Sequence, residues 1–130
     1  MDEDGWELRS AVEAHRANPE NFWIPDDAAR KGLQVGDAAR LIFDIGSKMD
    51  DGTVDVQGER IHVIVSEILD GHYIGILDSQ PVSVDPKSDF YLGFGVEVAF
   101  THEHVIDIDR PPDEYIEWQL KQAPEKRWPR

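Results

Sequence analysis

The sequence predicts an α+β domain in which a small, strongly bent antiparallel sheet, or a partly open β-barrel, is flanked by N- and C-terminal helices. β-rich runs separated by glycine-containing turns dominate residues 22–109. Helix-forming stretches flank them at residues 6–17 and 112–122. We therefore expect a single domain over residues 1–130, ending in a flexible tail at 123–130.

Composition limits the classes of function. The chain has 130 residues, 40% of them hydrophobic, which is enough for a core without disulfides. It has no cysteine, which excludes thiolate chemistry and fits a reducing compartment. The first residues are acidic, unlike a secretory signal, and no apolar run reaches the roughly 18 residues of a membrane span. We expect a soluble, cytoplasmic protein that is not exported by a cleaved leader.

The charge balance bears on partners. Lys and Arg total 13 against 27 Asp and Glu, a formal net charge of -14. Such a chain repels phosphate backbones and anionic lipid surfaces. We expect no nucleic-acid binding and no membrane binding, and charge favours a basic protein partner. A monomer and a homodimer are not distinguished.

The N-terminal third predicts two short helices. Residues 6–17 are helix formers with Leu8, Val12 and His15 at helical spacing. The stretch "FWIPDDAARKG" has a proline, an acidic first turn and a closing Gly32, which indicates a second helix of one or two turns. A strand is expected over residues 39–45.

The stretch "GSKMDDGTVDVQGE" that follows is polar and glycine-bearing, and it predicts a loop or a loose hairpin. It superficially resembles a calcium loop. With Gly52 at the sixth position, the first, third and twelfth positions are Ser47, Met49 and Gly58, which do not supply the required ligands. We expect no calcium there.

The stretch "RIHVIVSEILDGHYIGILDSQP" predicts a β-hairpin with a two-residue turn at Asp70-Gly71. In that register Val65 faces Ile76 and Ile64 faces Leu77. Both faces then carry apolar pairs, so the hairpin is expected to be covered on both sides, as in a small SH3-like barrel.

Two histidines in "FTHEHVIDID" raise the question of a metal site. In a regular strand Phe100, His102 and His104 would share one face. The pattern resembles that of cupins, which have a Glu three or four residues further on and a later His. Here those positions are Asp107 and Ile108, and no His follows His104. We expect ordinary strand-end histidines, with no metal and no cofactor.

No motif indicates catalysis. There is no nucleophile elbow, Ser-x-x-Lys pattern or glycine-rich phosphate cradle, so no catalytic residue is assigned. Trp6, Trp23 and Trp118 are expected in the core or as helix-docking residues, Trp118 together with Tyr115 and Leu120 on the C-terminal helix. Trp128, in the tail, is left open between an exposed residue and an anchor for a partner.

Five short motifs occur in order, "FWIP" (22–25), "LQVGD" (33–37), "GER" (58–60), "GILDSQP" (75–81) and "EHVIDI" (103–108). Together they resemble a family of small, uncharacterised bacterial domains, some of which are grouped with immunity proteins of polymorphic-toxin systems. The matching residues, within about 22–109, are Phe22, Ile24, Pro25, Leu33, Gly36, Asp37, Gly58, Glu59, Arg60, Gly75, Leu77, Pro81, Glu103, His104, Asp107 and Ile108. The chain departs from the pattern at Ile61-His62, Ser79-Gln80 and Val96. The resemblance implies that "EHVIDI" is a strand-entry element in which His104 has a structural role.

Three hypotheses for the function follow. The first is a non-enzymatic, immunity-like protein-binding module whose acidic surface orients a basic partner. The second is a small-ligand- or metal-binding β-barrel with possible enzymatic activity. The third is a structural homo-oligomer. The candidate binding residues are His62, Tyr73, Asp78, His102 and His104.

Overall fold

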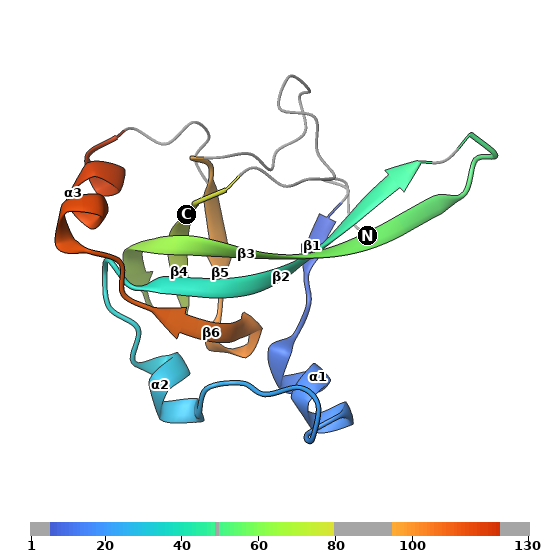
Figure 1. Ribbon diagram of the computed structural model, residues 1–130, viewed down its shortest axis with the longest axis horizontal. Helices are drawn as coiled ribbons and strands as arrows, with labels where there is room; N and C mark the ends of the chain where they lie inside the picture. The colour runs from blue at the N-terminus through green and yellow to red at the C-terminus, as the bar shows by residue number, and fades with distance from the viewer. Residues whose placement is uncertain (1–5, 49, 80–94, 123–130) are drawn as a thin grey trace.

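The computed structural model describes residues 6–48, 50–79 and 95–122, and it shows an α+β fold whose antiparallel sheet curls strongly into a half-barrel (Figure 1). The strands are β1 (Trp6–Leu8), β2 (Ala38–Lys48), β3 (Val54–Leu69), β4 (His72–Leu77), β5 (Glu97–Phe100) and β6 (Val105–Asp109), and the helices are α1 (Ala11–Ala17), α2 (Asp27–Lys31) and α3 (Asp113–Lys121), with a 3-10 turn η1 (His102–His104). The strand order is β1-β2-β3-β4-β5, with β6 also paired to β2. The predicted fold class is confirmed. The predicted tail lies outside the described residues.

Both faces of β2 are buried because successive side chains of a strand point to opposite sides. Leu41 and Phe43 point into the half-barrel, where they join the main core. Ile42 points outward and packs with Ala11 of α1 and Ile106 of β6. The described residues include no helix long and apolar enough to span a lipid bilayer.

The N-terminal prediction is corrected in part. Residues 6–17 are not one helix, because Trp6–Leu8 form β1 and pair with β2, with Trp6 opposite Ile45. The helix begins only at Ala11, where the Ser10 side chain accepts a hydrogen bond from the Glu13 backbone N–H. Trp6 is buried against the ring of Phe43, with ring centroids 5.7 Å apart. Burial of this indole outweighs the helix propensity of the segment.

The β3–β4 hairpin forms, but its register changes along the ladder. Next to the turn Ile68 faces Tyr73 as predicted, and Gly71 adopts a positive φ of 84°. An irregularity between Val65 and Glu67 then shifts the pairing by one residue, so that Val65 faces Gly75 instead of Ile76. The extra residue, Ser66, donates its hydroxyl to the Ile74 carbonyl at 3.2 Å.

The segment predicted as a loop or loose hairpin is a regular hairpin. β2 and β3 remain paired out to Lys48 and Val54. Gly52 has a positive φ of 88° in the turn, and Asp51 accepts hydrogen bonds from the Thr53 N–H and hydroxyl at 3.0 and 2.6 Å. This β2–β3 arm (residues 46–48 and 50–57) extends beyond the rest of the described chain (Figure 1).

Two tryptophans expected to be buried are exposed. Trp23 is 69% exposed because its neighbours in the chain, Phe22 and Ile24, both turn inward. They pack on the buried cluster formed by Ala11, Ile42 and Ile106. Trp118 is 51% exposed because α3 turns Ile116 and Gln119 inward instead. The helix itself is confirmed, and of the predicted docking residues Tyr115 and Leu120 are half-buried.

Candidate functional site

The five predicted binding residues do not form one site. Tyr73 and His102 line the same pocket, whereas His62 lies on the outer face of β3. Asp78 is bound to α3, and His104 is bound to the backbone before η1. The described residues contain no cluster of three or more His, Cys, Asp or Glu side chains able to hold a metal ion.

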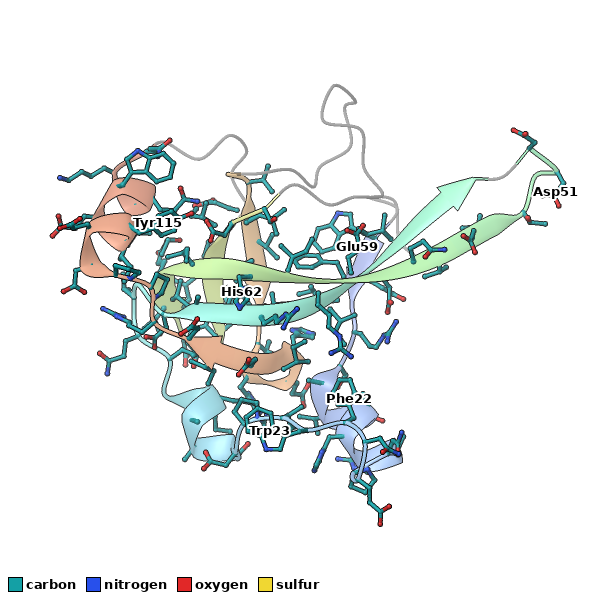
Figure 2. The ribbon with its side chains drawn as sticks, in the orientation of Figure 1. Phe22, Trp23, Asp51, Glu59, His62 and Tyr115 are labelled. Carbon is teal, nitrogen blue, oxygen red and sulfur yellow. The ribbon has the colours of Figure 1, made fainter. Side chains whose placement is uncertain are left out.

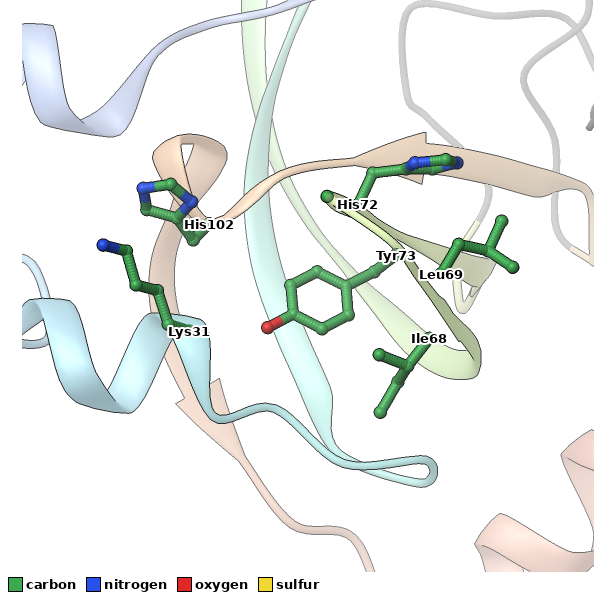
Figure 3. A pocket seen from close by; sticks show the side chains of 7 residues that line it. Lys31, Ile68, Leu69, His72, Tyr73 and His102 are labelled. Atoms are coloured by element: carbon green, nitrogen blue, oxygen red, sulfur yellow. The ribbon is translucent and has the colours of Figure 1, made fainter.

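The pocket around Tyr73 has a volume of about 240 Å³ and lies between the β3–β4 turn, α2 and η1 (Figure 3). Its lining residues are Lys31, Ile68, Leu69, Gly71, His72, Tyr73 and His102. Two of its polar groups already have protein partners: the Tyr73 hydroxyl donates to the Arg30 carbonyl at 3.1 Å, and Lys31 pairs with Asp27 at 2.9 Å. That ion pair lowers the pKa of Asp27. We therefore regard this pocket as the weaker candidate.

His102 and His104 do not share a strand face, because the chain does not continue as a regular strand after Phe100. Residues 102–104 form a 3-10 turn capped by Thr101. His104 Nδ1 accepts a hydrogen bond from the Thr101 N–H at 3.0 Å. Burial lowers the pKa of His104, which keeps the imidazole in the neutral form that this bond requires. These contacts give His104 a structural role.

Asp78 attaches α3 to the sheet. It accepts hydrogen bonds from the Tyr115 hydroxyl and from Gln119 Nε2. Burial, followed by the hydrogen bond to Asp78, raises the pKa of Tyr115 to about 12. The carboxylate is therefore part of the helix attachment and is already engaged.

Arg30 fixes the segment before α2 in place. Its side chain is buried, with Nε donating to the Pro25 carbonyl and Nη1 to the His102 carbonyl, both at 2.9 Å. These bonds connect the extended segment 22–25 to η1. The segment carries Phe22 and Trp23 along the outer face of the sheet.

That outer face holds a second pocket, which we call the aromatic–arginine pocket. Its volume is about 250 Å³, and it is lined by Asn21, Phe22, Trp23, Arg40, Arg60, Ile106 and Asp107. Figure 2 shows Phe22 and Trp23 beside the sheet, with His62 on β3. The guanidinium of Arg60 lies over the Phe22 ring, 5.8 Å from its centroid.

The two arginines of this pocket are unpaired within the described part of the chain. Arg40 is half-buried, and its Nε atom is buried with no hydrogen-bond partner. Asp107 faces Arg40 in the β2–β6 ladder but accepts from the Ile108 N–H at 2.9 Å, and no ion pair forms between Asp107 and Arg40 or Arg60. The guanidinium groups of Arg40 and Arg60 therefore leave hydrogen-bonding capacity unused beside this pocket.

The pocket continues into a stripe along the outer side of β3. Alternate residues of a strand share one face, so Val54, Val56, Arg60 and His62 form this outer stripe. Between them lies Gly58, where a side chain would come within 2.8 Å of the Arg9 guanidinium. Arg9 donates to Asp44 at 3.1 Å, which raises the pKa of Arg9.

Sequence reasoning identified His62 on this face but missed Arg40, Arg60, Trp23 and the two valines. Arg40 interrupts an apolar run at an outward position of β2, between buried Ala39 and Leu41. A charged residue between two apolar residues of a strand predicts a side chain on the face opposite the core, so Arg40 could have been assigned to the outer face from the sequence.

Comparisons with known proteins do not assign the chain to a family or a function. No protein-family model, no curated protein and no solved structure matches the chain significantly.

Proposed function

We propose that the protein is a non-enzymatic, immunity-like protein-binding module that acts in the cytoplasm on a basic protein partner. The observation that carries this proposal is the outer stripe together with the aromatic–arginine pocket. Trp and Arg are enriched at the energetic centres of protein interfaces, and Trp23 and Arg60 lie in the same pocket.

The β2–β3 arm supports the proposal. Every described residue from Asp50 to Gly58 is exposed, including Val54 at 63% and Val56 at 49%. An isolated two-stranded ribbon is only marginally stable in water, so a partner that covers these valines would stabilise the arm. Asp50 and Asp51, exposed at the turn of the arm, add carboxylates that complement a basic surface.

The net charge of -14 supports a basic partner and disfavours nucleic acid. Opposite charge accelerates and orients association, and salt screens it over a Debye length of about 8–10 Å at 0.1–0.15 M ionic strength. The association should therefore weaken as salt increases.

Affinity capture from native lysate with two valine variants tests the proposal. The wild-type protein should retain a basic protein at 50 mM salt and lose most of it at 500 mM. Val56→Ser should reduce capture of that protein about three- to tenfold, because the exposed half of the Val56 side chain is worth about 0.7–1.5 kcal/mol when buried.

Val35→Ser is the matched control, because Val35 is 45% exposed and lies outside the stripe. It should leave capture unchanged. If the two variants bind the protein equally well, the outer stripe is not the interface. If nothing basic is retained at low salt, the proposed partner class is wrong.

A further inference from the structure

We propose that the aromatic–arginine pocket binds the C-terminal carboxylate of a polypeptide that ends in an apolar residue. This inference extends the proposed function by naming the chemistry of one contact, and it is tested without any partner protein. It depends on three features of the pocket: unpaired positive charge, adjacent apolar surface and limited volume.

The charge of the pocket matches a single carboxylate. Arg40 and Arg60 contribute two positive charges and Asp107 one negative charge, which leaves +1 among the lining residues. A carboxylate carries one negative charge and neutralises this +1, whereas a phosphate dianion would leave one negative charge in excess. The planar guanidinium pairs well with a carboxylate, and the side chains of Arg40 and Arg60 line the pocket without an ion pair to a described residue.

The apolar surface distinguishes a chain end from an acidic side chain. Phe22, Trp23 and Ile106 line the same pocket as the arginines. A ligand that fills it must therefore carry an apolar group within a few ångströms of its carboxylate. A C-terminal Phe or Leu residue has both groups on one Cα, whereas Asp and Glu side chains lack the apolar part.

The volume of the pocket suits a single terminal residue of the bound chain. A pocket of about 250 Å³ is smaller than the roughly 300–1,000 Å³ typical of sites for drug-sized ligands. The exposed Asp107 carboxylate and Asn21 side chain on the lining are suited to hydrogen bonds with the last peptide groups of the bound chain.

Three peptide probes test the assignment by NMR and Trp fluorescence. Acetyl-Gly-Gly-Phe with a free carboxylate should shift the Arg40 Nε–Hε resonance, and it should change the tryptophan emission of the wild-type protein but not that of Trp23→Phe. It should bind at least tenfold more tightly than the same peptide with a C-terminal amide. Acetyl-Gly-Gly-Glu amide, which has a carboxylate only on its side chain, should bind as weakly as the amide.

Arginine variants test whether the peptide binds in the aromatic–arginine pocket. Arg40→Gln and Arg60→Gln should each weaken binding of the free-acid peptide at least tenfold. Arg16→Gln is the control, because Arg16 is exposed and pairs with Glu13 on α1, and it should bind within twofold of wild type. Arg60 is exposed, so its variant remains informative if Arg40→Gln fails to fold.

The proposal is overturned if the acid and amide peptides bind equally, if the Glu peptide binds more tightly than the acid, or if the Arg40 resonance does not respond in the wild-type protein. Each of these results leaves the protein-binding proposal standing, since that is decided by the valine variants.

Discussion

Replacing Arg30 with methionine tests how the segment that carries Trp23 is held. The change keeps most of the buried aliphatic volume and removes the guanidinium. Two 2.9 Å hydrogen bonds, to the Pro25 and His102 carbonyls, are then lost. Bonds to a charged group contribute about 1.5–3 kcal/mol each, a gross loss of about 3–6 kcal/mol.

Part of that loss is recovered, because the variant no longer has to desolvate a buried cation. We therefore expect the free energy of unfolding to fall by about 2–4 kcal/mol. With a urea dependence of about 1.5 kcal/mol per molar, the midpoint should fall by about 1.3–2.7 M. Chemical denaturation followed by far-UV circular dichroism measures this shift.

Tyr73→Phe is the control for Arg30→Met. It removes only the hydroxyl bond to the Arg30 carbonyl, so it should cost about 1 kcal/mol. If Arg30→Met unfolds within about 0.5 M of wild type, or at higher urea than Tyr73→Phe, then Arg30 does not hold this segment as described.

Two further predictions concern stability. The lowered pKa of His104 means that the folded state prefers the neutral ring. The stabilisation that the neutral ring gives the fold is therefore complete above the unfolded pKa of about 6.5, and it is lost as pH falls through the lower pKa of the folded state. Between pH 7.5 and 5, wild type should lose on the order of 1 kcal/mol more than His104→Gln, and parallel urea midpoints across this range would contradict the role of the cap. Gly75→Ala places a Cβ 2.7 Å from Val63 Cγ2 and should cost about 1–3 kcal/mol, while adding Val63→Ala should recover part of that loss. A double variant whose cost is the sum of both changes would show that the two sites are independent.

Local sequence patterns predicted a short helix within residues 22–32, a helix over 112–122 and the β3–β4 hairpin, because these depend on caps, turns and apolar spacing. The structure has α2 at Asp27–Lys31 and α3 at Asp113–Lys121. They did not predict the register shift at Ser66, which depends on how β3 meets the rest of the sheet. They also placed Trp23 in the core. A run of three large apolar residues does not reveal that the chain is extended there and turns its middle residue outward.

The candidate site was harder to predict than the fold. Of the five predicted binding residues only Tyr73 and His102 line one pocket, and Arg40, Arg60 and Trp23, which line the other, come from three separate segments. Their proximity results from long-range pairing of β2 with β3 and from the path of the chain after α1. Neither can be predicted from the hydrophobic periodicity of a short stretch of sequence.

The most direct test of the account compares two exposed tryptophans. Trp23 is 69% exposed beside the outer stripe, and Trp118 is 51% exposed on α3. Calorimetric titration of the captured basic protein should show about 30-fold weaker binding for Trp23→Ala, the loss expected of an interface hot spot worth about 2 kcal/mol. Trp118→Ala should bind within twofold of wild type. Equal affinities for the two variants, or a larger loss with Trp118→Ala, would contradict the assignment of the outer face as the binding surface.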